Sequence, residues 1–149
     1  MMRTGWAFLL LLFAPALHAW DVTVTRSFTI SGLTRTEDKL VLPTERKQYQ
    51  NVRILDKETY DFVLSCQTSC VQTLADVIPA VVDVRPAQTR RGMWVVQVAF
   101  NRAWLITFLV FQKGNDWRIK PPEHFAFIND GLAAQTRQLI LQAVRQENV

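Results

Sequence analysis

The two cysteines of the chain, Cys66 and Cys70, are four residues apart, and in an exported protein an even pair indicates a disulfide. In an extended strand such residues lie about 13 Å apart, beyond the roughly 7 Å between Cα atoms that a disulfide can bridge. In a helical turn they approach to about 6 Å, which is within reach. We therefore expect a disulfide, and with it a turn of the chain between the two residues.

A redox or metal role for this pair fits the spacing less well. Redox-active pairs typically have two intervening residues, whereas three residues separate Cys66 from Cys70. A metal site would need further ligands, and outside the amino-terminal segment the chain has one histidine, His124. We predict a structural disulfide, no metal site and no cofactor.

Glu123 and His124 are the candidate acid–base pair of the sequence. Nucleophilic catalysis needs a serine or cysteine next to such a base, and no motif marks one. The five glycines are scattered singly, so they form no phosphate-binding loop. We expect a protein that is not an enzyme and has no catalytic residues. A hydrolase that uses Glu123 and His124 is the alternative.

Positive charge is concentrated in one part of the chain. Residues 85–120 include seven arginines and lysines but one acidic residue, Asp116. Such a surface favours an acidic partner, which could be a protein, a glycan or lipid headgroups, although a solvated sheet face would have the same composition. Of these we expect a protein. Nucleic acid is not an expected partner of an exported protein. The expected partner-binding residues are Arg90, Arg91, Arg102, Trp117 and Arg118.

The amino terminus predicts export. Arg3 precedes an apolar run at 6–17, and small residues follow, which is the pattern of a cleavable signal. As a helix the run covers about 18 Å, against about 30 Å for the hydrocarbon core of a membrane. We predict a signal peptide at 1–19, with cleavage after Ala16 as the competing choice. The remainder, 20–149, is expected to be a single periplasmic domain without an integral membrane segment.

Most of the domain is expected to be sheet. Apolar and polar residues alternate over 22–30, with Arg26 as the misfit and Gly32 as the stop. The clearest element is a hairpin at 92–112, whose second strand is apolar on both sides, as in a strand covered on both faces. Further short strands are predicted at 39–42, 52–55, 60–64, 80–84 and 117–119.

A helix is expected in the middle of the chain, at 68–78. Val71, Leu74 and Ile78 share one face of it, and Pro79 ends it.

A second, amphipathic helix is expected at the carboxy terminus. Asn129 or Asp130 caps it, and apolar residues recur at helical spacing from Leu132 to Val144. Strands with helices segregated from them predict an α+β fold. We expect an antiparallel sheet of about five to six strands, with one central helix and the carboxy-terminal helix packed on it.

Residues of the predicted hairpin region also form a motif. An Arg-Pro pair is followed by a Gly-x-Trp that opens the hairpin and by a Thr-Phe-Leu on its second strand; these are Arg85, Pro86, Gly92, Trp94, Thr107, Phe108 and Leu109. This pattern resembles the CsgE family of periplasmic curli assembly and transport factors. The resemblance implies a non-enzymatic adaptor that holds secretion substrates or docks on an outer-membrane pore.

Together these patterns favour a periplasmic accessory protein, a chaperone or adaptor of a secretion or surface-assembly system that binds a protein partner. A small secreted inhibitor or immunity protein that blocks an enzyme is the alternative. A homo-oligomer is compatible with either hypothesis.

Overall fold

The computed structural model describes residues 18–88 and 90–147. The predicted signal peptide at 1–19 lies almost entirely outside them. Within the described residues, ten strands and two helices are present, and the strands divide between two five-stranded sheets. The expected α+β class is confirmed. Neither described helix has the length and apolar character needed to cross a membrane.

The first sheet is built from segments that are far apart in the sequence. β1 (Trp20–Val24) and β2 (Phe28–Thr36) form a hairpin, and β10 (Phe125–Phe127) pairs with the other edge of β2. β3 (Lys39–Val41) pairs with the end of β2, and β5 (Cys70–Gln72) runs parallel to β1. Three of these five strands are only three residues long, so pairing within this sheet is limited.

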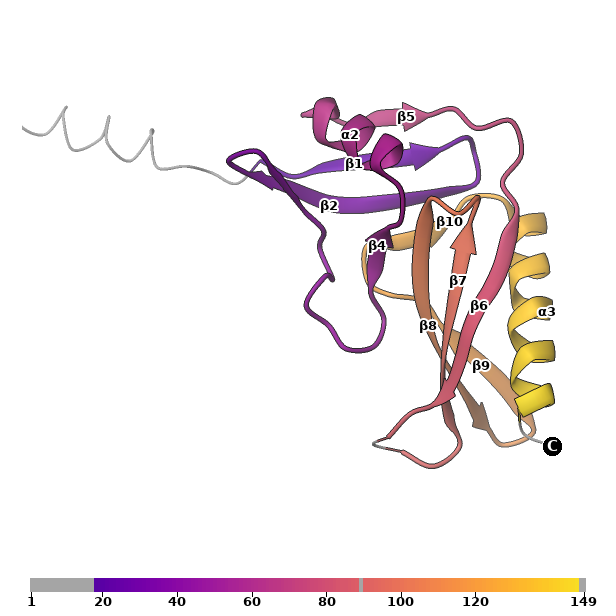
Figure 1. The fold of residues 1–149 in the computed structure, drawn as a ribbon. Helices are drawn as coiled ribbons and strands as arrows, with labels where there is room; N and C mark the ends of the chain where they lie inside the picture. The colour runs from indigo at the N-terminus through magenta and orange to yellow at the C-terminus, as the bar shows by residue number, and fades with distance from the viewer. Residues whose placement is uncertain (1–17, 89, 148–149) are drawn as a thin grey trace, which may run out of the picture.

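The second sheet is larger and fully antiparallel. β6 (Pro79–Pro86), β7 (Met93–Phe100) and β8 (Trp104–Lys113) follow one another as neighbours. β4 (Val52–Ile54) pairs with the beginning of β8, and β9 (Asp116–Lys120) with its end. β8 is thus the central strand, and its first five residues are all buried. The strands of this sheet run across the direction of those of the first sheet (Figure 1).

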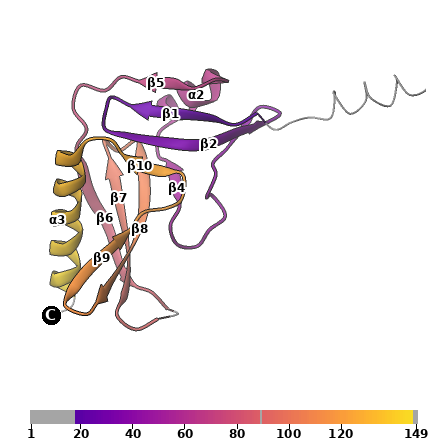
Figure 2. The same cartoon turned by 180° about the vertical axis from the view of Figure 1, so that it is seen from behind.

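The helix α3 (Asp130–Glu147) packs along β6 and also contacts β7 and β10. Figure 2 shows it on the same side of the second sheet as β10. The side-chain oxygen Oδ1 of Asn129 accepts a hydrogen bond from the N–H of Leu132 at 3.0 Å, which makes Asn129 the N-cap. The buried residues of α3 recur every four positions: Leu132, Thr136, Ile140 and Val144.

The second helix, α2 (Lys57–Cys66), contacts β3 and β4.

One hydrophobic core joins the two sheets and α3. Phe28 of the first sheet is fully buried in it. The centroid of its ring is 5.1 Å from that of Phe100, 6.3 Å from that of Trp104 and 5.3 Å from that of Phe125. The second sheet contributes the side chains of one face, which we call the inner face and which includes Val96, Val98, Ile106 and Phe108.

The hairpin expected at 92–112 is confirmed as β7 and β8, and the strand expected at 117–119 as part of β9. Asn101 and Arg102, in the turn between β7 and β8, both have positive φ, 54° and 55°, as a tight hairpin turn requires. The carboxy-terminal helix is also confirmed, with Asn129 as its cap.

The central helix lies at different residues from those expected. The helix predicted at 68–78 is wrong, because this segment contains β5, and Val71 of the expected buried face is exposed. Main-chain pairing with β1 keeps β5 extended. The strand predicted at 60–64 is also wrong, because its apolar run belongs to α2, which buries Thr59 and Val63 one turn apart.

The strand predicted at 22–30 is a hairpin of two strands. Arg26, the misfit in the alternation, lies in the turn between β1 and β2 and has a φ of 53°. Gly32 does not end the strand, since β2 continues to Thr36. The φ of Gly32 is 74°, and a Cβ there would come within 2.9 Å of Nδ1 of His124, so this position requires glycine.

The expected disulfide between Cys66 and Cys70 is confirmed, with a Cα–Cα distance of 6.0 Å. Cys66 is the last residue of α2, Gln67 takes a left-handed conformation, and Cys70 begins β5. The chain turns between the cysteines, as expected. The bridge therefore ties the end of a helix to the short outer strand of the first sheet.

The strand β6 is an edge strand of the second sheet. It begins with Pro79 and ends with Pro86. Its register with β7 shifts between Val81 and Asp83, which leaves Val82 as an exposed bulge. Prolines donate no N–H and a bulge interrupts the row of pairing groups, so both weaken further pairing along this edge.

We expect Phe28→Ala to lower the free energy of unfolding by about 3–5 kcal/mol, because it removes a fully buried ring and leaves a cavity between the sheets. Urea denaturation followed by tryptophan fluorescence measures the change. The control is Val71→Ala at a side chain that is 61% exposed, which should change the stability by less than about 0.5 kcal/mol. Equal losses in the two variants would contradict the central place of Phe28.

The double variant Cys66→Ala/Cys70→Ala should lower the free energy of unfolding by about 2 kcal/mol, which the loop-entropy model gives for so short a loop. Thermal denaturation tests this. A reductant should produce the same loss in the wild type and no further loss in the double variant. If the double variant were as stable as the oxidised protein, the bridge would not contribute to stability.

Candidate functional site

The structure brings three of the five expected contact residues to one end of the second sheet. Arg90 and Arg91 are exposed in the connection that leads to Met93, the first residue of β7. Phe111 of β8 pairs with Met93 on one side and with Arg118 of β9 on the other. Arg118 is therefore at the same end of the sheet as Arg90 and Arg91.

The other two expected contact residues are placed differently. Arg102 lies in the turn before Trp104, at the opposite end of the hairpin from Phe111, which is about 24 Å away along β8. Trp117 is partly buried against the core, and its carbonyl oxygen accepts a hydrogen bond from Arg137 at 2.9 Å. Trp117 thus serves packing more than it serves an exposed contact surface.

Basic residues also line the face of the second sheet that points away from α3, which we call the outer face. Four of them, on β4, β6 and β9, lie directly opposite apolar residues of the central strands β7 and β8. The pairs are Arg53 with Leu105, Arg85 with Val95, Lys120 with Leu109 and Arg118 with Phe111. We call these four basic residues and their apolar partners the basic face. In Figure 1 this side of β6, β7 and β8 is turned toward the viewer.

Two apolar residues of the basic face are buried, although α3 covers the opposite, inner face. Val95 is 1% exposed and Leu105 is 8% exposed. Arginine and lysine stems cover apolar neighbours while their charged groups stay in water. Nε of Arg85 also lies 3.3 Å from a carboxylate oxygen of Asp83. An apolar strip with charged flanks suits a partner that supplies both acidic and apolar groups.

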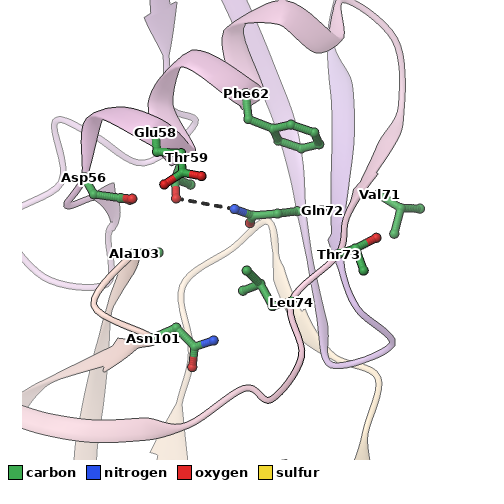
Figure 3. Close-up of a pocket in the computed structure, with 10 residues that line it drawn as sticks. All are labelled: Asp56, Glu58, Thr59, Phe62, Val71, Gln72, Thr73, Leu74, Asn101 and Ala103. Carbon is green, nitrogen blue, oxygen red and sulfur yellow. Dashed lines mark hydrogen bonds between the residues drawn. The ribbon is translucent and has the colours of Figure 1, made fainter.

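A cleft with a volume of about 560 Å³ lies at the other end of the β7–β8 hairpin (Figure 3). Ligand sites typically have volumes of about 300–1,000 Å³. Three segments build the cleft: the beginning of α2, the strand β5 with the residues that follow it, and the turn between β7 and β8. The hairpin turn is distant in the sequence from the other two segments, so the cleft exists only in the folded chain.

Buried hydrogen bonds fix the floor of this cleft. Nε1 of Trp104 donates to Oε1 of Gln72 at 2.9 Å, and Nε2 of Gln72 donates to Oγ1 of Thr59 at 3.4 Å. At the opening, Oδ1 of Asn101 accepts from the N–H of Ile78 at 2.6 Å. These bonds connect β8, β5, α2 and the hairpin turn, so the walls of the cleft are held relative to one another.

The charged residues of the lining, Asp56 and Glu58, are both acidic. Asp56 is the N-cap residue of α2 but makes no side-chain capping hydrogen bond. Its Oδ1 atom is buried and, among the described residues, has no hydrogen-bond partner. We call this site the acidic cleft. The sequence does not indicate this site, because the strands predicted at 52–55 and 60–64 place Asp56 in a connection between them, whereas it is the N-cap of α2.

A third candidate site contains Ser31 and His124, whose side chains lie next to each other. Oγ of Ser31 lies 3.4 Å from Nδ1 of His124, and both side chains are close to the surface. The carboxylate of Glu123 lies 3.7 Å from Nζ of Lys47. A serine beside a histidine is the beginning of a nucleophilic site, which further needs a group that orients the histidine. Within the described part of the chain, no carboxylate forms a hydrogen bond with His124.

Histidine, cysteine, aspartate and glutamate side chains do not gather in threes that could hold a metal ion anywhere within residues 18–88 and 90–147.

The comparisons with known proteins add no relative: no protein-family model, no curated protein and no solved structure matches this chain. The functional inference therefore depends on the basic face, the acidic cleft and the sequence pattern.

Proposed function

We propose that this chain is a non-enzymatic periplasmic accessory protein, a chaperone or adaptor of a secretion or surface-assembly system, that binds an acidic protein partner. The basic face carries the proposal. Its four cations stand directly opposite apolar residues of two central strands, on a sheet whose inner face is packed into the core. Two of these apolar residues, Leu109 and Phe111, are partly exposed, so at the Arg118 end the face combines apolar contact area with charges that attract and orient an acidic surface.

Arg90 and Arg91 extend the basic face at one end. They lie in an exposed connection next to Met93, at the level of Arg118. A partner that contacts Arg118 can therefore contact the connection as well. Arg102 lies at the opposite end of the hairpin from Arg118, in the turn near the Arg53 end of the basic face.

The compartment is supported by two features. The predicted signal peptide directs export, and the Cys66–Cys70 disulfide is a bond that persists in oxidising compartments. The resemblance to the CsgE family supports the kind of partner, a secretion substrate or an outer-membrane pore.

Export predicts that the mature protein begins at Trp20, the first residue of β1. Intact-mass measurement of the periplasmic fraction of the source cells should give the mass of residues 20–149 with one disulfide. A full-length chain that retains Met1 in the cytosol would contradict the proposed compartment.

The charge-reversal variant Arg118→Glu should lose most of the partner captured from a periplasmic extract, because it places a negative charge in the basic face. The variant Arg90→Glu/Arg91→Glu should weaken capture in the same way. Raising the salt concentration should release the partner from the wild type, since exposed charges are screened. Quantitative mass spectrometry of the captured proteins measures each effect.

Arg145→Glu is the matched control, because it makes the same charge change at an exposed residue of α3, which lies on the other side of the sheet from the basic face. It should capture the partner as the wild type does. Equal capture by all variants would argue against the basic face. If the captured protein is an enzyme whose activity falls on binding, the chain is an inhibitor and not an adaptor.

A further inference from the structure

The acidic cleft is opposite in charge to the basic face and distant from its Arg118 end. Asn101, which lines the cleft, follows the last residue of β7, whereas Met93 beside Arg91 is the first. A strand of this length spans about 24 Å between its first and last residues. A ligand in the cleft would leave the Arg118 end accessible, so the cleft can be considered independently of the proposed function.

The charged groups of the cleft are acceptors. The amide oxygen and nitrogen of Gln72 are both hydrogen-bonded in the floor, to Trp104 and Thr59 respectively. At the opening, the amide oxygen of Asn101 accepts a hydrogen bond from the N–H of Ile78, and its amide nitrogen donates one to the carbonyl of Asp76. The carboxylates of Asp56 and Glu58 and the hydroxyl of Thr73 remain, and the two carboxylates are the charged groups of the lining. This set of groups suits a ligand that is positively charged and donates several hydrogen bonds.

An aromatic ring stands next to these acceptors. Figure 3 shows the ring of Phe62 projecting into the cleft beside Gln72, on the same helix as Glu58. A planar guanidinium can stack on such a ring while it donates hydrogen bonds to a carboxylate, whereas an ammonium has no plane to stack. The combination therefore favours arginine over lysine.

Exposed aliphatic side chains occur in the lining of the cleft and next to lining residues. Val71 lines it and is 61% exposed. Leu55 precedes Asp56 in the sequence and is 50% exposed. Ile78, whose N–H donates a hydrogen bond to Asn101, is 62% exposed. A single small cation would leave these side chains in water. A polypeptide would cover them with the residues on either side of its basic side chain.

We propose that the acidic cleft binds an arginine side chain of a polypeptide partner. The guanidinium lies against Phe62 and donates hydrogen bonds to the carboxylate of Glu58. Apolar residues next to that arginine rest on Val71, Leu55 and Ile78.

The test uses the peptide acetyl-Val-Leu-Arg-Val-Leu-amide and the same peptide with citrulline in place of arginine, which keeps the shape and removes the charge. Each is titrated into the ¹⁵N-labelled protein, and the indole N–H signal of Trp104 reports on the floor of the cleft. We expect a saturable shift with the arginine peptide and at least about tenfold weaker binding of the citrulline peptide. Free arginine amide should also bind more weakly than the arginine peptide.

Glu58→Gln should weaken binding of the arginine peptide about tenfold without disturbing the fold, because Glu58 is exposed. Asp61→Asn is the matched control, with the same loss of charge on an exposed residue of the same helix that does not line the cleft. It should bind as the wild type does. Arg118→Glu should also bind the arginine peptide normally, which separates this site from the basic face.

Three results would overturn the proposal: equal binding of the arginine and citrulline peptides, no shift of the Trp104 signal at millimolar peptide, or equal weakening by Glu58→Gln and Asp61→Asn. Binding of free arginine amide as tight as that of the peptide would overturn the assignment to a polypeptide.

Discussion

The packing of Phe28 between the two sheets is the contact on which the rest of the structure depends. The first sheet has three strands of only three residues, and such short pairings contribute little stability by themselves. Its position is fixed because Phe28 meets Phe100 and Trp104 of the second sheet and Phe125 of its own. Burial of these rings supplies the apolar contact that holds the two sheets across each other.

Trp104 connects this core to the acidic cleft. Its ring packs near Phe28, while its one N–H donates to Gln72 and, through it, reaches Thr59 of α2. A side chain with an apolar body and a single donor can serve the core and a polar site together. The Cys66–Cys70 disulfide also links α2 to β5, the two elements that these hydrogen bonds connect. The geometry of the cleft is therefore a consequence of how the core packs.

The sequence predicted the elements whose contacts are local. The β7–β8 hairpin, α3 with its Asn129 cap and the disulfide all follow from neighbouring residues and their spacing. The predictions from the sequence were wrong where pairing with a distant segment determines the structure. β5 is extended because it pairs with β1, and Arg53 joins the basic face only because β4 pairs with the beginning of β8. The acidic cleft forms where the distant turn between β7 and β8 meets the stretch from α2 to β5, so no local pattern could indicate it.

The edge strand β6 of the second sheet has a consequence for aggregation. An uncovered strand is a template on which foreign strands can stack, and cross-β aggregates grow in this way. With a proline at each end, Pro79 and Pro86, and an outward kink at Val82, β6 offers no continuous row of donors and acceptors. β6 is therefore a poor template for the addition of a further strand, whether from another chain or from a second copy of this one.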